Sequence, residues 1–288
     1  MAPELAAVVI DNASSDGTVE RATRRHAQTL ANAENRGFAG AVNQGFRTTT
    51  ADLVLLVNPD VRLRSPIGDL IEASQQYGLA AGQLTDSEGQ PQAGFSIRRF
   101  PTAAALAFEL LGVNRLWPGN AVNRRYRYLD RDLRQGGPVE QPAGAFLMIR
   151  RDVWNQLGGF DESFHPVWFE DVDFCLRASK AGYRIEYVPK VQAEHTGGHS
   201  VGKLDRARRQ VYWYDSLLRY AAKHYGNFGY RGVCLAAGVS SVPRTVAGMI
   251  QERSLSPVVS CFKILYLTGR RLVSRPRLTC GPVDINNS

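Results

Sequence analysis

The chain has 288 residues, of which 44% are hydrophobic and 22% charged, and this excludes a disordered tail and favours one large globular domain with room for an appendage. Its four cysteines, Cys175, Cys234, Cys261 and Cys280, form no CxxC pair, which excludes a zinc knuckle and a disulfide framework and favours a reducing cytoplasm.

The net charge of +8 belongs to the C-terminal third of the chain. Residues 201–288 hold 14 Lys/Arg against 4 Asp/Glu, whereas residues 1–200 hold 21 against 23. Such asymmetry indicates an anionic partner, either nucleic acid or a membrane surface. No apolar run reaches the about 18 residues of a spanning helix, and no basic start precedes an apolar core, so we expect neither a spanning helix nor a signal peptide.

The first quarter of the chain alternates strand and helix signals. A β-branched run, "AAVVID" (6–11), ends at Asp11, and a helix is predicted from Thr18 to about Leu30. The stretch "NRGFAGAVNQGF" (35–46) opens a second helix, and a buried strand (53–57) ends in "NPD" (58–60). This order predicts an α/β sheet with its loops gathered at one edge, where ligands bind in such sheets.

Regular signals are weaker between about 85 and 140, which we interpret as a variable excursion carrying one helix near 102–112. A strand (145–149) and a short helix entered at Asp152 follow. A helix is predicted from Glu170 to Ala181, with Asp173 and Arg177 as i,i+4 partners and with Glu170 and Asp171 in its first turn. A strand (183–189) and long helices over 203–225 and parts of 229–275 complete the prediction.

Acidic residues and a histidine pair stand at the ends of these elements. Asp11, Asp60 and the pair Glu170/Asp171 join His195 and a second histidine in the loop "EHTGGHS" (194–200). Carboxylate and imidazole suit Mg²⁺ or Mn²⁺, which take their other ligands from phosphate and water. Taken singly, "NPD" is more often a turn and "EDVD" a solvated helix start; their joint occurrence favours a site.

The whole set of motifs resembles a known family. "VVIDNASSDGT", "NRGFAGAVNQGF", "LLVNPDV", "GAFLMIRRDVWNQLGGFDESF", "EDVDFCLRASKAGY" and "HTGGHS", in this order, are similar to the family 2 inverting glycosyltransferases of the GT-A fold, and most of all to the bacterial rhamnosyltransferase-like branch. The resemblance covers about residues 6–225. It implies a Rossmann-like mixed central sheet with flanking helices, a GT-A catalytic domain over 1–225 and a basic helical extension over 226–288.

The resemblance also implies a reaction and its participants. The enzyme would transfer a sugar, with rhamnose as a candidate, from a nucleotide diphosphate donor to a surface polysaccharide or lipid-linked acceptor, with Mg²⁺ or Mn²⁺ as cofactor. Asp171 would be the general base, and Glu170 would bind acceptor or support the base. Trp168 and Phe169 would stack on a sugar, or simply pack in the core. The donor would contact Asp11, Asn12, Gly37, Phe38, Asn43, Asn58 and Asp60, and the metal would be held by Asp60 and His195.

The chain departs from its relatives at its N-terminus. Relatives begin with a further strand and helix, where this chain has only "MAPEL". We therefore expect a truncated sequence that is poorly active alone, because loss of an interior strand leaves backbone groups unpaired. The alternative to an enzyme is an inactive relative that binds glycan or nucleotide.

The basic tail is the least determined part. Residues 256–277 combine Val259, Phe262, Leu265, Tyr266 and Leu272 with Lys263, Arg270, Arg271 and Arg275. This pattern predicts an interfacial helix at an anionic membrane, where a polyprenyl-linked acceptor would be reached. The alternative is a helix packed on the catalytic domain with solvated arginines. No nucleic-acid motif accompanies the charge, so we expect no nucleic-acid partner. From the interfacial helix we expect a cytoplasmic enzyme at the inner face of the cell membrane.

Overall fold

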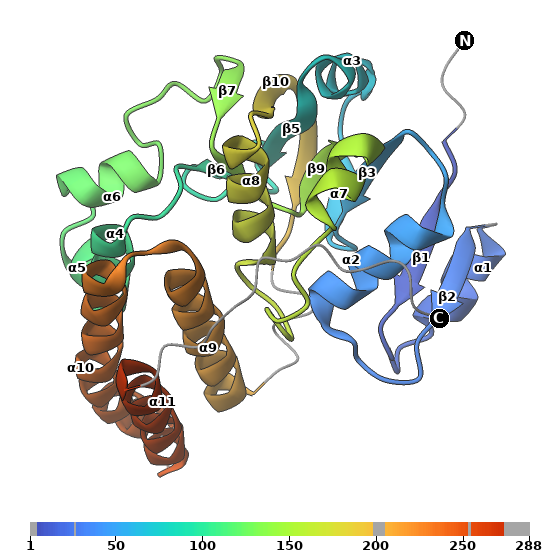
Figure 1. The fold of residues 1–288 in the computed structure, drawn as a ribbon. Coiled ribbons are helices and arrows are strands. Elements are labelled where there is room, and N and C mark those ends of the chain that lie inside the picture. The colour runs from blue at the N-terminus through green and yellow to red at the C-terminus, as the bar shows by residue number, and fades with distance from the viewer. Residues whose placement is uncertain (1–4, 26, 198–204, 253–254, 274–288) are drawn as a thin grey trace.

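The computed structural model describes residues 5–25, 27–197, 205–252 and 255–273. In Figure 1 a small strand pair lies at one side of a larger sheet, and three long C-terminal helices lie at the other. The strands are β1 (Val8–Asp11), β2 (Gln28–Ala31), β3 (Leu53–Val57), β4 (Val61–Leu63), β5 (Gly78–Thr85), β6 (Ile97–Arg98), β7 (Gly137–Val139), β8 (Gln141–Pro142), β9 (Phe146–Arg150) and β10 (Arg184–His195). The helices are α1 (Thr18–Arg24), α2 (Gly37–Thr48), α3 (Gly68–Tyr77), α4 (Ala103–Leu110), α5 (Val113–Leu116), α6 (Ala121–Tyr126), α7 (Arg151–Leu157), α8 (Glu170–Lys180), α9 (Arg206–His224), α10 (Asn227–Glu252) and α11 (Ser256–Val273).

The central sheet is mixed. Its strands lie in the order β3-β9-β5-β10-β4, and β7 pairs with β10 outside this path. β10 is parallel to β5, whereas β9 is antiparallel to both of its neighbours, β3 and β5. β4 is antiparallel to β10, with Val61 opposite His195. This last pairing brings the end of β10 beside the turn that follows β3, and it positions the site described below.

Helices cover both faces of the sheet. Alternate residues of a strand point to opposite faces, and β5 is buried along its whole length. Leu79 of β5 packs with Phe174 of α8 in one core cluster, whereas its neighbour Ala80 packs with Leu70 of α3 in another. The predicted α/β fold with a mixed central sheet and flanking helices is therefore confirmed.

The three C-terminal helices share one core. Tyr214 and Leu217 of α9, Val233 of α10 and Ile264 of α11 are fully buried in a single cluster. This cluster also takes in Phe169, two residues before the predicted base Asp171. The predicted domain boundary at residue 225 falls between α9 and α10, which belong to the same core.

Several elements differ from the sequence prediction. The helix predicted from Thr18 to about Leu30 ends at Arg24, and β2 follows it. β4, α3 and β5 were not predicted, and the excursion over 85–140 holds three helices instead of one. The strand predicted over 183–189 continues to His195, so this histidine lies on the strand itself.

β1 and β2 form a separate parallel pair. Among the residues that the structure describes, no strand joins β1 to β3. The family resemblance implies a further strand inside the sheet, placed before Ala6 in sequence, and this stays a prediction.

Candidate functional site

Asp60 and His195 lie side by side at the edge of the sheet. Asp60 follows β3 in a turn closed by a hydrogen bond from the Val61 N–H to the Asn58 carbonyl (3.0 Å). The Nε2 atom of His195 is 3.6 Å from Oδ2 of Asp60, which is too long for a hydrogen bond, and both side chains are less than 9% exposed. The predicted metal ligands are thus brought together by the pairing of β4 with β10.

The chemistry of this pair fits a divalent cation. The Oδ1 atom of Asp60 is buried and has no hydrogen-bond partner among the described residues. A buried carboxylate left unpaired is costly, and a cation would compensate it. No cluster of three His, Cys, Asp or Glu side chains occurs in the described part of the chain, so an ion at Asp60 and His195 would take its other ligands from phosphate and water.

Asp171 lies in the first turn of α8 and contacts the segment that precedes β9. Its Oδ2 atom accepts a hydrogen bond from the Gly144 N–H (2.9 Å), and its Oδ1 atom accepts one from the Val172 N–H (2.8 Å). A Cβ atom at position 144 would be 3.0 Å from the Asp171 Cβ, so the close approach favours glycine there. Burial raises the pKa of Asp171, and the hydrogen bond from Gly144 opposes this rise.

Glu170 is the more strongly perturbed member of the carboxyl pair. It is 3% exposed, and its Oε2 atom has no partner among the residues described. Burial first, and then the neighbouring charge of Asp171, raise the pKa of Glu170 well above its usual range. Both carboxyl groups of the pair thus have raised pKa values, and the role of Asp171 as the base stays a prediction.

The backbone before this pair is strained. Trp168 and Phe169 have φ angles of 81° and 72°, a left-handed conformation that aromatic residues rarely adopt. Such strain is concentrated at functional sites. The Phe169 ring packs against Tyr220 (centroids 5.3 Å apart), so it follows the core-packing alternative that the sequence left open. Trp168 is only partly buried and keeps the prediction of a sugar contact.

Asp173, the third carboxylate of this helix turn, is structural. It is fully buried and lies 2.8 Å from the Arg177 Nε, 2.8 Å from the Lys223 Nζ and 2.7 Å from the His224 Nε2. Burial raises its pKa, but the hydrogen bond from His224 and the charges of Arg177 and Lys223 outweigh burial and lower the pKa to about 2. The predicted pairing with Arg177 is confirmed, and α9 supplies the two further cations.

Asp11, which is predicted to bind the nucleotide donor, has one carboxylate oxygen without a hydrogen-bond partner among the described residues. It is buried at the end of β1, and its Oδ2 atom accepts a hydrogen bond from the Ser14 N–H (3.0 Å). The other oxygen, Oδ1, has no partner within the described ranges. A hydrogen bond from a nucleotide base to this oxygen, which the family resemblance implies, stays a prediction.

Other predicted donor residues bind the protein itself. The Asn12 side chain accepts a hydrogen bond from the Arg36 N–H (2.9 Å), and the Asn43 side chain donates to the Phe160 carbonyl (2.9 Å). The space that Gly37 opens is filled, because a Cβ atom there would be 2.7 Å from the His165 Nδ1. Contacts of the donor with Asn12, Gly37, Phe38, Asn43 and Asn58 stay predictions.

The sequence analysis missed four residues that surround the two acidic centres. The Phe95 ring stacks on His195 (centroids 4.9 Å apart, planes 9° apart), and Gln92 hydrogen-bonds the same histidine. Arg98 is the cation whose charge lowers the pKa of Asp171. Gly144 is the fourth. All but Gly144 come from the irregular stretch 85–140, where arginine and aromatic enrichment was the available signal.

The second histidine of "EHTGGHS" lies outside the described residues.

Two curated proteins and one solved structure are similar to this chain. The N-acetylglucosaminyl-diphospho-decaprenol L-rhamnosyltransferase of Mycobacterium tuberculosis is 28% identical over 236 residues, covering 76% of this chain and 75% of that protein. Rhamnosyltransferase WbbL of Escherichia coli is 28% identical over 164 residues, covering 55% of this chain and 57% of that protein. Among solved structures, GalNAc-T7 with UDP, GalNAc and Mn²⁺ matches with a TM-score of 0.50 and 11% identity, over 76% of this chain and 44% of that chain, and it supports the GT-A-like fold.

A family model described as "Glycosyltransferase like family 2" matches residues 2–214, about three quarters of the chain. The chain therefore belongs to glycosyltransferase family 2, and its curated relatives include rhamnosyltransferases.

Proposed function

We propose that this enzyme is an inverting, metal-dependent glycosyltransferase that moves a sugar, with rhamnose as the first candidate, from a nucleoside diphosphate to a lipid-linked glycan acceptor. One observation carries the proposal. The backbone of Gly144 and Ala145 joins the two acidic centres, because Gly144 donates to Asp171 (2.9 Å) and Ala145 accepts from the Asn58 N–H (3.0 Å). A base and a metal-ligand pair are thus held by adjacent residues of one short segment.

The donor end of the reaction would lie at Asp60 and His195. These residues would hold Mg²⁺ or Mn²⁺, which as a Lewis acid supplies neutralisation of the charge that develops on the leaving diphosphate. Asp11 would bind the nucleotide base through its unpaired oxygen. The similarly folded GalNAc-T7 was solved with UDP and Mn²⁺, which supports this combination.

The acceptor end would lie at Asp171. As the acceptor hydroxyl oxygen bonds to the anomeric carbon, its proton passes to the Asp171 carboxylate. The bond from the anomeric carbon to the diphosphate breaks, and its electron pair leaves with the diphosphate. Attack opposite the leaving group inverts the anomeric centre. General base catalysis of this kind contributes about 10² to 10⁴ in rate.

The lipid-linked acceptor is favoured by the name of the M. tuberculosis relative, an N-acetylglucosaminyl-diphospho-decaprenol transferase, and by the surface of the C-terminal helices. α10 exposes a continuous apolar stripe, since Leu235, Val239, Val242, Val246 and Ile250 recur every three or four residues and are 47–73% exposed. α11 adds further exposed apolar residues, among them Val259, Phe262 and Tyr266. An apolar stripe of this length on a protein surface indicates a membrane or a partner.

Two details of this surface correct the sequence prediction. Arg271 is 9% exposed and pairs with Asp215, and Leu272 packs against the core, so neither faces a membrane.

The second detail concerns α10. Residues Asn227–Gln251 are long and apolar enough to cross a membrane by length and composition, with a mean hydropathy of 1.4, although 44% of the segment's most apolar 18-residue stretch is buried in the protein. We propose that the stripe lies on an anionic membrane at the cytoplasmic face.

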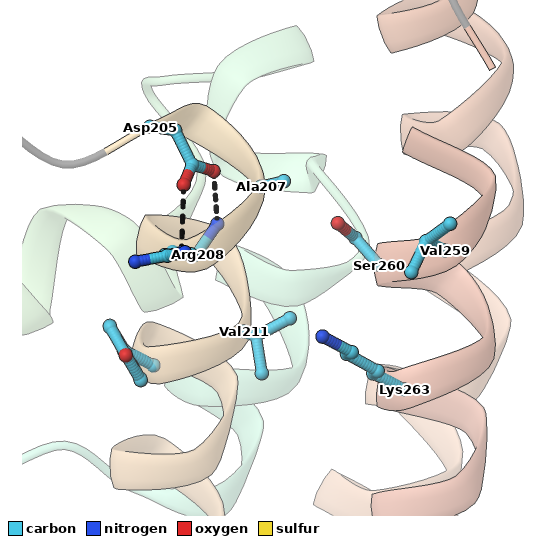
Figure 2. Close-up of a pocket in the computed structure, with 8 residues that line it drawn as sticks. Asp205, Ala207, Arg208, Val211, Val259, Ser260 and Lys263 are labelled. Carbon is cyan, nitrogen blue, oxygen red and sulfur yellow. Dashed lines mark hydrogen bonds and ion pairs between the residues drawn. The ribbon is translucent and has the colours of Figure 1, made fainter. Parts of the chain in front are cut away.

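A cavity of about 430 Å³ lies between α9 and α11 at the border of this surface. Figure 2 shows Val211 of α9 and Lys263 of α11 pointing into the space between the helices, with Arg208 and Asp205 paired nearby. Further along α9, the Ser216 hydroxyl donates a hydrogen bond to the Val167 carbonyl (3.0 Å). Val167 directly precedes Trp168. Besides apolar side chains, the cavity is lined by Lys263 and by the Asp205–Arg208 pair, and we propose that it lies on the membrane side of the acceptor site and takes an amphiphile with an acidic head.

We expect the protein to bind vesicles that contain phosphatidylglycerol more tightly than vesicles of phosphatidylcholine alone. Replacing Phe262 and Tyr266 together by serine should lower the partition coefficient about tenfold or more, because two aromatic side chains no longer enter the interface. Sedimentation with vesicles measures this. Leu116→Ser, an 86% exposed residue of α5, is the matched control. Equal binding by all three proteins would contradict membrane contact through α11.

The function is tested by turnover. The enzyme, Mg²⁺, a nucleoside diphosphate rhamnose and polyprenyl-diphospho-N-acetylglucosamine should yield a rhamnosylated lipid whose new linkage has the opposite anomeric configuration to the donor, as proton NMR of the product reports. A retained configuration would contradict the mechanism. Donor binding without any transfer, to this or other glycan acceptors, would favour the alternative of an inactive binding relative.

A further inference from the structure

Gln92 makes a two-point contact with His195. Its Nε2 atom donates a hydrogen bond to the His195 carbonyl oxygen (2.7 Å), and its Oε1 atom lies 3.0 Å from the His195 Nδ1. The first contact fixes the orientation of the amide, because a carbonyl oxygen only accepts. The group that faces the imidazole is therefore the amide oxygen, which also only accepts.

This orientation decides where the imidazole carries its proton. An acceptor 3.0 Å from Nδ1 requires a hydrogen on Nδ1, so a neutral His195 has its lone pair on Nε2. That atom lies 3.6 Å from the Asp60 Oδ2, with no proton to share between them. Two electron-rich atoms that face each other at this distance repel, and a cation between them would relieve the repulsion.

Gln92 is itself held in place by the sheet. Its N–H donates to the Leu84 carbonyl at the end of β5 (2.9 Å), and its carbonyl accepts hydrogen bonds from Phe95 (3.1 Å) and Ser96 (3.0 Å). β5 is the parallel neighbour of β10, which carries His195. Phe95 from the same turn stacks on the imidazole. The histidine ring is thus restrained on one side by hydrogen bonds and on one face by a ring.

We propose that Gln92 is a positioning residue that holds His195 as the Nδ1–H tautomer and directs Nε2 toward the cation. This inference rests on the proposed metal dependence of the enzyme. Partners that orient a metal-binding histidine in this way change metal affinity by about 10- to 100-fold. The role of Gln92 is to preset the ligand before the donor diphosphate arrives.

The test combines metal affinity with a tautomer measurement on the metal-free protein. Gln92→Leu should weaken binding of Mn²⁺, added as MnCl₂ alone and followed by electron paramagnetic resonance, by about 10- to 100-fold. Gln92→Glu keeps an acceptor for Nδ1–H but loses the donor to the His195 carbonyl, so its affinity should lie between that of Gln92→Leu and that of the unchanged protein. Gln90→Leu changes an exposed glutamine of the same loop and should bind Mn²⁺ like the unchanged protein.

Nitrogen NMR separates this inference from the proposed function. The His195 signals, identified by their absence in His195→Asn, should show a proton on Nδ1 in the unchanged protein and loss of that preference in Gln92→Leu. A proton on Nε2 in the unchanged protein, or full Mn²⁺ affinity in Gln92→Leu, would overturn the role of Gln92. Absence of Mn²⁺ binding with the Nδ1–H tautomer intact would instead contradict the metal dependence and leave the positioning contact established.

Discussion

Replacing Asp171 by asparagine is expected to lower kcat by about 10² to 10⁴ and to leave donor binding unchanged. Asparagine keeps one oxygen to accept from Gly144, but it loses the acceptor for the Val172 N–H and cannot take a proton from the acceptor hydroxyl. Because burial raises the pKa of Asp171, loss of the buried charge should offset the loss of that hydrogen bond, and the fold should be kept. Turnover assays with calorimetry of donor binding on the same protein measure both quantities.

A pH profile and a matched control variant accompany this prediction. Activity of the unchanged enzyme should fall on the acid side of its pH profile at a pH above the ordinary aspartate range, because the base works only when ionised and its pKa is raised. Asp152→Asn, in an exposed ion pair with Arg150, should leave kcat unchanged. Near-normal turnover by Asp171→Asn would exclude Asp171 as the base.

Replacing Asp173 by asparagine should lower the free energy of unfolding by about 3–5 kcal/mol, the cost typical of breaking a buried ion pair from one side. Asp173 is fully buried among Arg177, Lys223 and His224, so its loss leaves cations of α8 and α9 without their shared carboxylate. Urea denaturation followed by circular dichroism measures the change. Asp152→Asn should change stability by less than about 1 kcal/mol, since its pair is exposed.

The effect of Asp173 should depend on pH in one direction. Its folded-state pKa of about 2 lies below the ordinary value of 3.8, so the native state holds fewer protons and gains stability as the carboxyl ionises. The contribution is complete above pH about 4 and is lost as pH falls toward about 2. The stability difference between the unchanged protein and Asp173→Asn should narrow over that range. A constant difference would contradict the ion network as its cause.

The site was predictable where polar residues end regular elements. Asp60 and Asp171 follow clear signals, a buried strand and a helix start, and the structure places them at adjacent segments. The approach of His195 to Asp60 depends on the pairing of β4 with β10, which joins residues more than a hundred positions apart. Sequence order alone does not encode such a pairing, and the family resemblance supplied it.

Other features were hidden because small or polar residues form them. β5 reads "GLAAGQLT", which lacks the β-branched pattern of a strand, yet it is buried throughout between β9 and β10. Gln92 lies in a polar turn, and only the folded position of His195 gives it a partner. Arg271 was expected to face lipid with its neighbours, but its partner Asp215 comes from another helix. Tertiary contacts decide each of these positions.

Metal-dependent donor binding, on which the proposed function rests, is measured by calorimetry of the protein with a panel of nucleoside diphosphate sugars, each with Mg²⁺ and again with EDTA. At least one donor should bind, and EDTA should lower its affinity by about tenfold or more, a loss of about 1.4 kcal/mol or more. Asp60→Asn should lower the affinity in the same way in the presence of Mg²⁺. Binding that is indifferent to both EDTA and Asp60→Asn, or no binding of any donor, would contradict metal-dependent donor binding.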